Sequence, residues 1–153
     1  MKNDPFTLLS DEHRRLTALF DALEAAGGHR RETLFGELRT ALNLHAESEE
    51  GALYPLLENN EETCYLAIQA YDEHDMVKAL LAELGKEPVG SKAWLARLRV
   101  MREIVDNHMT EEEEELLPEA RQLLSQEQIC QLWDDLAHVW TRYYPHVARG
   151  RHR

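Results

Sequence analysis

Apolar residues recur three and four positions apart along almost the whole chain, and polar residues fill the positions between them. This spacing places the apolar side chains on one face of an α-helix, and no segment shows the strict alternation that is typical of a β-strand. Glycine and proline are scarce, with 7 and 5 residues, and they lie in groups between the periodic segments. The pattern therefore predicts an all-α protein with long helices and short turns.

The positions of glycine, proline and capping residues divide the chain into five expected helices. Asp4 and Pro5 begin the first helix, Gly27 and Gly28 follow its end, and Ser125 opens the last one with a capping box. The expected helices cover about residues 5–26, 30–57, 61–84, 92–124 and 126–144. Four long helices with short connections are typical of an antiparallel up-down four-helix bundle. We expect a single domain, 1–153, with the bundle at about 4–124 and a short fifth C-terminal helix appended at about 126–144.

The two halves of the chain repeat each other. DEHRRLTALFDAL (11–23) overlays DEHDMVKALLAEL (72–84), and LHAESEEGALYP (44–55) overlays NHMTEEEEELLP (107–118). Chance similarity between amphipathic helices explains the shared leucines, but it explains poorly the paired DEH and the paired His-x-x-x-Glu-Glu-x-x-Leu-x-Pro. Each half is therefore expected to be one helical hairpin, in which the repeated proline kinks or ends the second helix.

Helical spacing places one histidine of each long helix inside the apolar stripe of that helix. These four residues are His13, His45, His74 and His108. Glu49 and Glu112 lie one turn after the second and fourth of them, on the same faces. A single histidine of this kind is usually a core residue with a hydrogen-bond partner. Four histidines and two carboxylates that meet in one bundle need a common set of partners that satisfies all of them.

A run of five glutamates, 111–115, is by itself more typical of a solvated helix face. The four-residue step from His108 singles out Glu112 as the inward-facing member. Glu113 and Glu114 are expected to face water, while Glu111 and Glu115 flank the inner face.

Buried polar groups without partners are costly, at about 1–3 kcal/mol each even when neutral. A chain of hydrogen bonds or bound metal would satisfy the cluster. Imidazole and carboxylate at helical spacing suit a pair of first-row metal ions, because the neutral nitrogens donate and the carboxylates bridge and balance charge. Manganese or zinc would fit the same donors as well as iron does.

The composition limits the classes of molecule that the protein is expected to bind. Lys plus Arg is 17 and Asp plus Glu is 29, giving a net charge of −12, which argues against nucleic acid and against an anionic membrane surface. No apolar run reaches membrane-spanning length, and the first residues lack a signal-peptide core. Cys64 and Cys130 lie far apart without a metal or redox motif, as expected for a reduced, cytoplasmic protein.

The remaining histidines do not lie in the repeated motifs and are expected at the surface: His29, His138, His146 and His152. The Trp133, Leu136 and Trp140 stripe would be either the packing face of the fifth helix or the surface of a homodimer.

One histidine per helix, with His-x-x-x-Glu on the second and fourth helices, resembles the hemerythrin-like (HHE cation-binding) domain family. The resemblance spans about residues 4–124. It implies a four-helix bundle that holds two non-haem iron ions joined by an oxygen bridge. Carried over by position, His13 and His45 would hold one iron and His74 and His108 the other. Glu49 and Glu112 would bridge them.

The chain departs from the oxygen-carrying members of that family. They have a second histidine four residues after the one on the third helix, where this chain has Lys78, and their last motif is His-x-x-x-x-Asp, where this chain has His108 and Glu112. One iron is thus short of a histidine, which leaves an open position or one filled by water, Tyr71 or Glu111. Ferritin-like proteins, by contrast, place Glu three residues before His.

The resemblance implies a diiron protein whose open site binds or senses a small molecule such as dioxygen, nitric oxide or peroxide. Leu16, Phe20, Leu42, Val77 and Val105 are expected to wall that site. The alternative is a diiron enzyme with peroxidase, nitric-oxide-reducing, ferroxidase or iron-centre repair activity, and the sequence identifies no dedicated catalytic residue. A third alternative is a metal-free interaction module with a buried polar network.

Overall fold

A computed structural model describes residues 3–145, and all of the regular structure in that range is helical. Its helices, in chain order, are α1 (Pro5–Ala25), α2 (Gly28–Ser48), α3 (Tyr54–Leu57), α4 (Cys64–Leu84), α5 (Lys92–Glu111), α6 (Leu117–Leu123) and α7 (Gln126–Tyr143). Two π-helical turns, η1 (Glu49–Leu53) and η2 (Glu112–Leu116), join α2 to α3 and α5 to α6.

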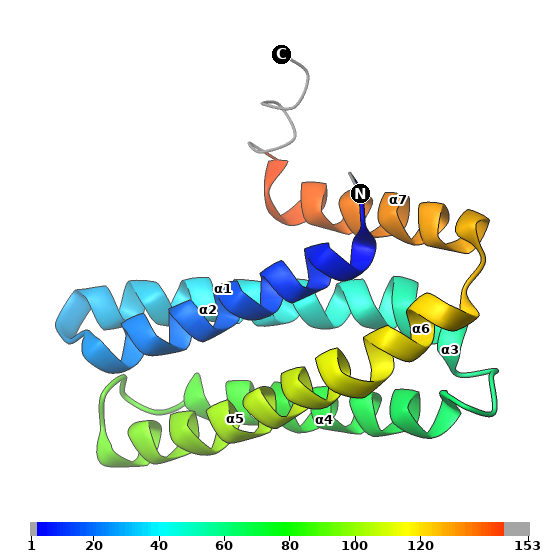
Figure 1. Ribbon diagram of the computed structural model, residues 1–153. Helices are drawn as coiled ribbons and strands as arrows, with labels where there is room; N and C mark the ends of the chain where they lie inside the picture. Colours follow the sequence, from blue (N-terminus) through cyan, green and yellow to red (C-terminus); the bar gives the residue numbers. More distant parts are fainter. Residues whose placement is uncertain (1–2, 146–153) are drawn as a thin grey trace.

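Two antiparallel hairpins form the bundle. The α1–α2 hairpin packs on the α4–α5 hairpin, and α7 lies across the outside of α1 and α2 (Figure 1). This arrangement confirms the predicted all-α bundle with an appended C-terminal helix. It also brings the two halves of the sequence repeat face to face.

The helix boundaries follow local signals. The Asp4 carboxylate accepts the Phe6 N–H at the start of α1, and Ser125 and Gln128 form the predicted capping box at the start of α7. The expectation that the third long helix starts at residue 61 was wrong, because Asn60 accepts the Glu62 N–H through its side chain and holds residues 60–63 in turns. The helix begins at Cys64 instead.

The π-helical turns occupy the same place in both halves of the repeat. The Tyr54 N–H donates to the Glu49 carbonyl and the Leu117 N–H to the Glu112 carbonyl, each a step of five residues. Pro55 and Pro118 follow directly and have no N–H with which to continue an α-helical ladder. The repeated proline thus ends a wide turn that starts at an inward-facing glutamate, a turn type frequent at functional sites.

The core has two apolar parts. One lies toward the α1–α2 turn and includes Phe20, Leu38 and Trp94, and the other lies toward α3 and α6 and includes Leu9, Leu53 and Leu57. Both parts consist of buried apolar side chains, so they hold the helices in place on either side of the polar residues discussed below.

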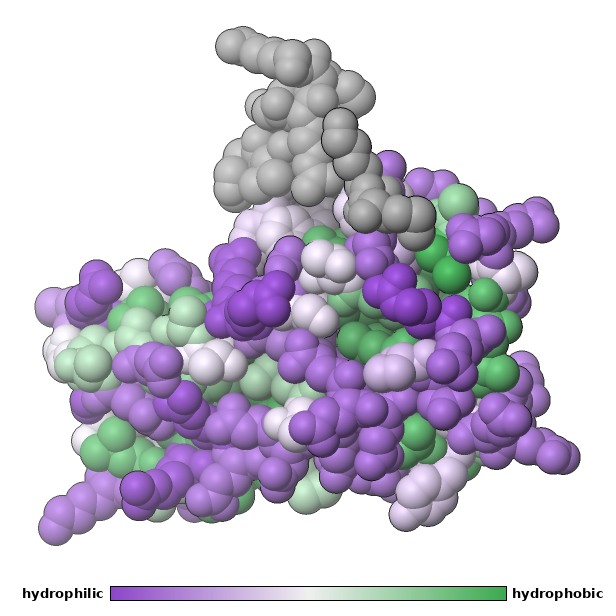
Figure 2. Space-filling view, in the orientation of Figure 1, coloured by the Kyte–Doolittle hydropathy of each residue, from purple (hydrophilic) through white to green (hydrophobic). Residues whose placement is uncertain are grey.

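Helix α7 covers the second part of the core. Leu132 and Leu136 are fully buried and drive its docking, whereas Trp133 is half-buried. The predicted tryptophan–leucine stripe is therefore a packing face, and a homodimer stays a prediction. The face seen in Figure 2 is mostly hydrophilic with small hydrophobic areas between. No helix within residues 3–145 is long and apolar enough to span a bilayer.

Candidate metal centre

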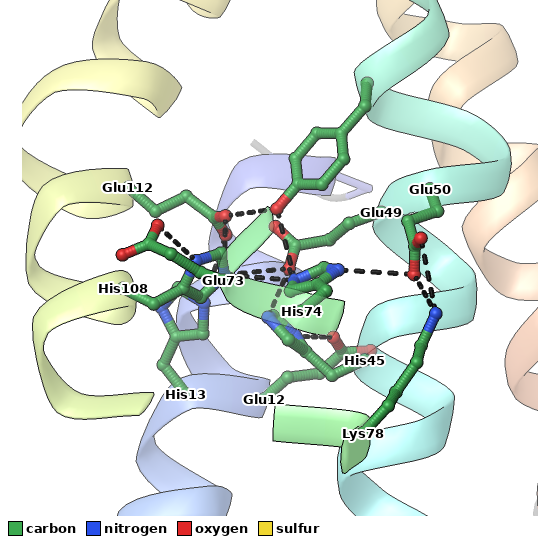
Figure 3. A network of polar contacts seen from close by, with 11 residues as sticks. Glu12, His13, His45, Glu49, Glu50, Glu73, His74, Lys78, His108 and Glu112 are labelled. Atoms are coloured by element: carbon green, nitrogen blue, oxygen red, sulfur yellow. Dashed lines mark hydrogen bonds and ion pairs between the residues drawn. The ribbon is translucent and has the colours of Figure 1, made fainter. Parts of the chain in front are cut away.

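All six predicted site residues converge between the two parts of the core (Figure 3). The four histidines and two glutamates are each at most 5% exposed. Every histidine turns its Nε2 atom inward. The Nε2 atoms of His74 and His108 are 3.1 Å apart, and the His74 Nε2 lies 3.3 Å from the Glu49 Oε1.

The second half of the cluster forms around Glu112. Its Oε1 lies 3.2 Å from the His13 Nε2, and its Oε2 lies 3.1 Å from the His108 Nε2. His45 Nε2 contacts the Glu49 Oε1 one helical turn away. The six residues therefore lie in contact with one another, as the sequence predicts.

The donor atoms form two overlapping groups, each with atoms within 4.8 Å of one another. One group is His45, Glu49, His74 and His108, and the other is His13, His45, Glu49 and Glu112. Several inward atoms make no hydrogen bond of regular geometry, and most of them approach one another only as ion pairs: the Nε2 atoms of His13 and His45, both Glu49 oxygens and the Glu112 Oε1. Fully buried donors left without hydrogen bonds fit cations bound between them, because such groups are otherwise costly.

Each histidine has a carboxylate near its outer ring nitrogen. The Nδ1 atoms lie 3.1 Å from Glu12 for His45, 3.2 Å from Glu73 for His108, 3.3 Å from Glu50 for His74 and 3.6 Å from Glu113 for His13. A carboxylate on Nδ1 fixes the ring orientation and leaves the Nε2 lone pair free for a metal. Three histidines show this hydrogen-bonded pattern of a metal ligand, whereas the Nδ1 of His13 makes no hydrogen bond and lies near Glu113 at ion-pair distance only.

These four carboxylates were missed in the sequence, although the repeat contains them. Glu12 and Glu73 are the middle residues of the two DEH triplets, and each holds the histidine of the next helix in its own hairpin. Glu50 and Glu113 are the second glutamates of the two His-x-x-x-Glu-Glu motifs, and each reaches the opposite hairpin. The repeated glutamates were the available signal.

Glu113 corrects one expectation. Its side chain is 40% exposed, but its Oε1 turns back toward His13 Nδ1 instead of facing water only. The reason is that the π-helical turn changes the direction of the residues that follow Glu112. Glu114 is exposed, as expected.

Tyr54 supplies the phenol nearest the cluster, and neither Tyr71 nor Glu111 occupies that place. The Tyr54 hydroxyl donates to the Glu112 Oε2 at 2.8 Å and lies 3.3 Å from the His74 Nε2. Tyr71 packs its ring against that of Tyr54, and Glu111 accepts a hydrogen bond from Gln69. Tyr54 follows η1, so a regular helical period did not predict its inward direction.

The cluster retains protons in the absence of metal. Burial alone would lower the pKa of His45, but attraction to Glu49 and a hydrogen bond to Glu12 raise it to about 10. Burial alone would raise the pKa of Glu49, yet attraction to His45 holds it well below its usual value. Burial and the nearby carboxylates raise the pKa of Tyr54 well above 10, so the phenol keeps its proton. Protons thus balance the buried carboxylates where cations would otherwise do so.

A small cavity of about 20 Å³ adjoins the inner histidines. Three histidines, Asn43 and Lys78 line it together with apolar residues: Leu42, Ala46, Val77, Leu81 and Val105. Leu42, Val77 and Val105 were among the expected walls, whereas Leu16 and Phe20 lie in the adjoining core. Lys78 stands at its rim and donates to Glu50 at 3.0 Å. The cavity has room for about one molecule of a few atoms.

The other histidines with described positions lie outside the cluster. His29 and His138 are exposed, as expected, and His146 and His152 lie outside the described residues. Cys64 and Cys130 are both free thiols.

Comparison with known proteins agrees with this geometry. The model of a family described as Hemerythrin HHE cation binding domain matches residues 4–120. A solved structure of a hemerythrin HHE cation binding domain-containing protein from Mycobacterium kansasii superimposes with a TM-score of 0.79, at 22% identity, over 92% of this chain and 86% of that one. That likeness supports the fold.

A curated relative from Nostoc sp. (strain PCC 7120 / SAG 25.82 / UTEX 2576), described as a DNA nickase, is 30% identical over 121 residues. The match covers 76% of this chain but only 33% of the relative. The chain therefore spans about a third of the length of that protein.

Proposed function

Because the chain belongs to the family of hemerythrin HHE cation binding domains, we propose that it holds two iron ions in its histidine–glutamate cluster and presents them to a small molecule such as dioxygen, nitric oxide or peroxide. The observation that carries the proposal is the set of buried, inward-facing polar atoms without hydrogen bonds, backed by a hydrogen-bonded outer carboxylate on three of the four histidines. Hydrogen-bonded networks that are purely structural do not leave so many inner atoms without hydrogen bonds.

The two donor groups share His45 and Glu49, and Glu112 belongs to the second group alone. In the proposed arrangement, His74 and His108 would serve one ion and His13 and His45 the other, with Glu49 and Glu112 held in common. When bound, a pair of irons supplies Lewis acidity and two electrons in one site. The outer carboxylates would orient the imidazoles of His45, His74 and His108 and raise their basicity.

The cavity supports the proposed class of ligand. Its lining is almost entirely apolar beyond the histidines, and its volume admits only a few atoms. Such a space favours a small, weakly hydrated molecule and excludes ionic or bulky substrates. Binding or sensing of a small molecule is therefore the function best supported.

One observation favours turnover as a second candidate. The Tyr54 hydroxyl keeps its proton inside the cluster, donates to Glu112, and would be able to donate a hydrogen bond to a bound peroxide. Steady-state consumption of peroxide by the iron-loaded protein, lost in Tyr54→Phe, would establish the enzyme. Consumption that stops after one turnover would speak against an enzyme and support the binding of small molecules instead.

DNA nicking is not carried over from the Nostoc relative. The match covers a third of that protein, and a net charge of −12 opposes contact with phosphate backbones.

Metal analysis tests the proposal. Protein purified without oxygen and reconstituted with ferrous iron should hold about two irons per chain, and His108→Ala or Glu49→Ala should lower that number clearly. His138→Ala, at an exposed histidine, and Glu114→Ala, at an exposed glutamate, are the matched controls and should keep the native content. Native iron content in His108→Ala and Glu49→Ala would overturn the assignment.

A further inference from the structure

Glu12 connects the metal cluster to the appended helix. Its side chain is only 6% exposed, and both of its oxygens are hydrogen-bonded. The Oε2 lies 3.1 Å from the His45 Nδ1, and the Oε1 accepts the Trp140 indole N–H at 2.6 Å. A contact therefore runs from α7, through a buried carboxylate, to one of the four central imidazoles.

Trp140 is itself held in place. The buried Leu132 and Leu136 dock α7 on the bundle, the Trp140 ring packs on Tyr144 at 4.7 Å, and the Arg15 guanidinium lies over Tyr144. An indole N–H donates and does not accept, so the carboxylate must receive it. The direction of Glu12 is thus fixed by the packing of a helix outside the bundle.

The equivalent position in the other hairpin lacks this support. Glu73 is the repeat partner of Glu12 and lies 3.2 Å from the His108 Nδ1. Among residues 3–145 it receives no second hydrogen bond, and it borders an open groove on α4 and α5 instead. The two halves of a symmetric sequence repeat are thereby made unequal by α7.

We propose that Trp140 is a positioning residue that acts through Glu12 to hold His45 in the orientation and tautomer needed for metal. His108 lacks this support, because its partner Glu73 receives no second hydrogen bond from the described part of the chain. This inference rests on the proposed metal-binding function. Outer hydrogen-bond partners of ligating histidines commonly change metal affinity by about 10–100-fold.

Anaerobic titration of metal-free protein with Co²⁺, followed by its visible absorption, tests this in one experiment. In Trp140→Phe, one of two equivalents should bind at least tenfold more weakly, with altered bands. Trp133→Phe makes the same change on the same helix, at a half-buried position remote from the cluster, and should match the native protein. Equal titrations of the two variants would overturn the proposal.

A double-mutant cycle distinguishes positioning from general loosening. Glu12→Gln should weaken binding of the same equivalent of Co²⁺. Adding Trp140→Phe should lower the affinity little further, because both changes break the same Trp140–Glu12–His45 relay. Full additivity of the two effects would show that Trp140 does not act through Glu12.

A second readout needs no metal. Imidazole ¹⁵N shifts of the metal-free protein should move for His45 in Trp140→Phe and stay in place for His108. Unmoved His45 shifts would refute the relay. If the native protein takes up neither Co²⁺ nor Fe²⁺, the proposed function fails, and the imidazole shifts alone decide whether the relay exists.

Discussion

At the scale of single residues, the candidate site has two layers of polar atoms. The Nε2 atoms of the histidines face the cluster, and the outer Nδ1 atoms of His45, His74 and His108 are hydrogen-bonded to carboxylates. His74 shows this most completely: its Nδ1 lies 3.3 Å from Glu50, which Lys78 in turn neutralises, while its Nε2 faces the cluster. Lys78 stands where the oxygen carriers have a histidine, and here its ammonium group pairs with Glu50.

Metal binding should release protons, because His45 keeps one in the metal-free protein. With a pKa of about 10, its imidazole is protonated at neutral pH, and a cation must displace that proton. The apparent metal affinity should therefore rise with pH until about pH 10, by about tenfold per unit for each proton released. Titration calorimetry at pH 7 in two buffers of different ionisation enthalpy measures the number. Equal heats in both buffers would contradict the protonated state.

At the scale of elements, the helix pattern was readable from the sequence, but the π-helical turns were not. Apolar spacing, caps and prolines located the start of every long helix to within about three residues, because these signals are local. A π-helical turn leaves no separate signature, and the inward directions of Tyr54 and Glu113 depend on it. Contacts between opposite hairpins, such as Glu50 with His74, also have no local period to reveal them.

The docking of α7 should depend on its buried leucines. Leu136 is fully buried, so Leu136→Ala should lower the free energy of unfolding by about 2–5 kcal/mol, through lost contact and the cavity left behind. Met76→Ala, at an exposed apolar position on α4, should change it by less than about 0.5 kcal/mol. Urea denaturation of metal-free protein measures both. An unchanged midpoint for Leu136→Ala would mean that α7 adds little to stability.

At the scale of the whole molecule, the cluster joins four helices in the layer between two separate apolar cores. In the metal-free state this central layer consists of buried charges balanced by protons, an arrangement that stabilises weakly. Cations in the same place would hold both hairpins together at their middle. Metal is thus expected to act as a structural bond as well as a site for ligands.

Removing metal should therefore lower the melting temperature. A cation that binds only the folded chain adds about 2.7 kcal/mol at a hundred times its dissociation constant, which corresponds to about 5–10 °C for a chain of this size. Differential scanning calorimetry with and without chelator measures the shift. Glu49→Ala, which lacks the carboxylate common to both donor groups, should show a much smaller dependence on chelator. A native melting temperature that chelator leaves unchanged would instead support a metal-free helical module, because a buried polar network has nothing for a chelator to remove.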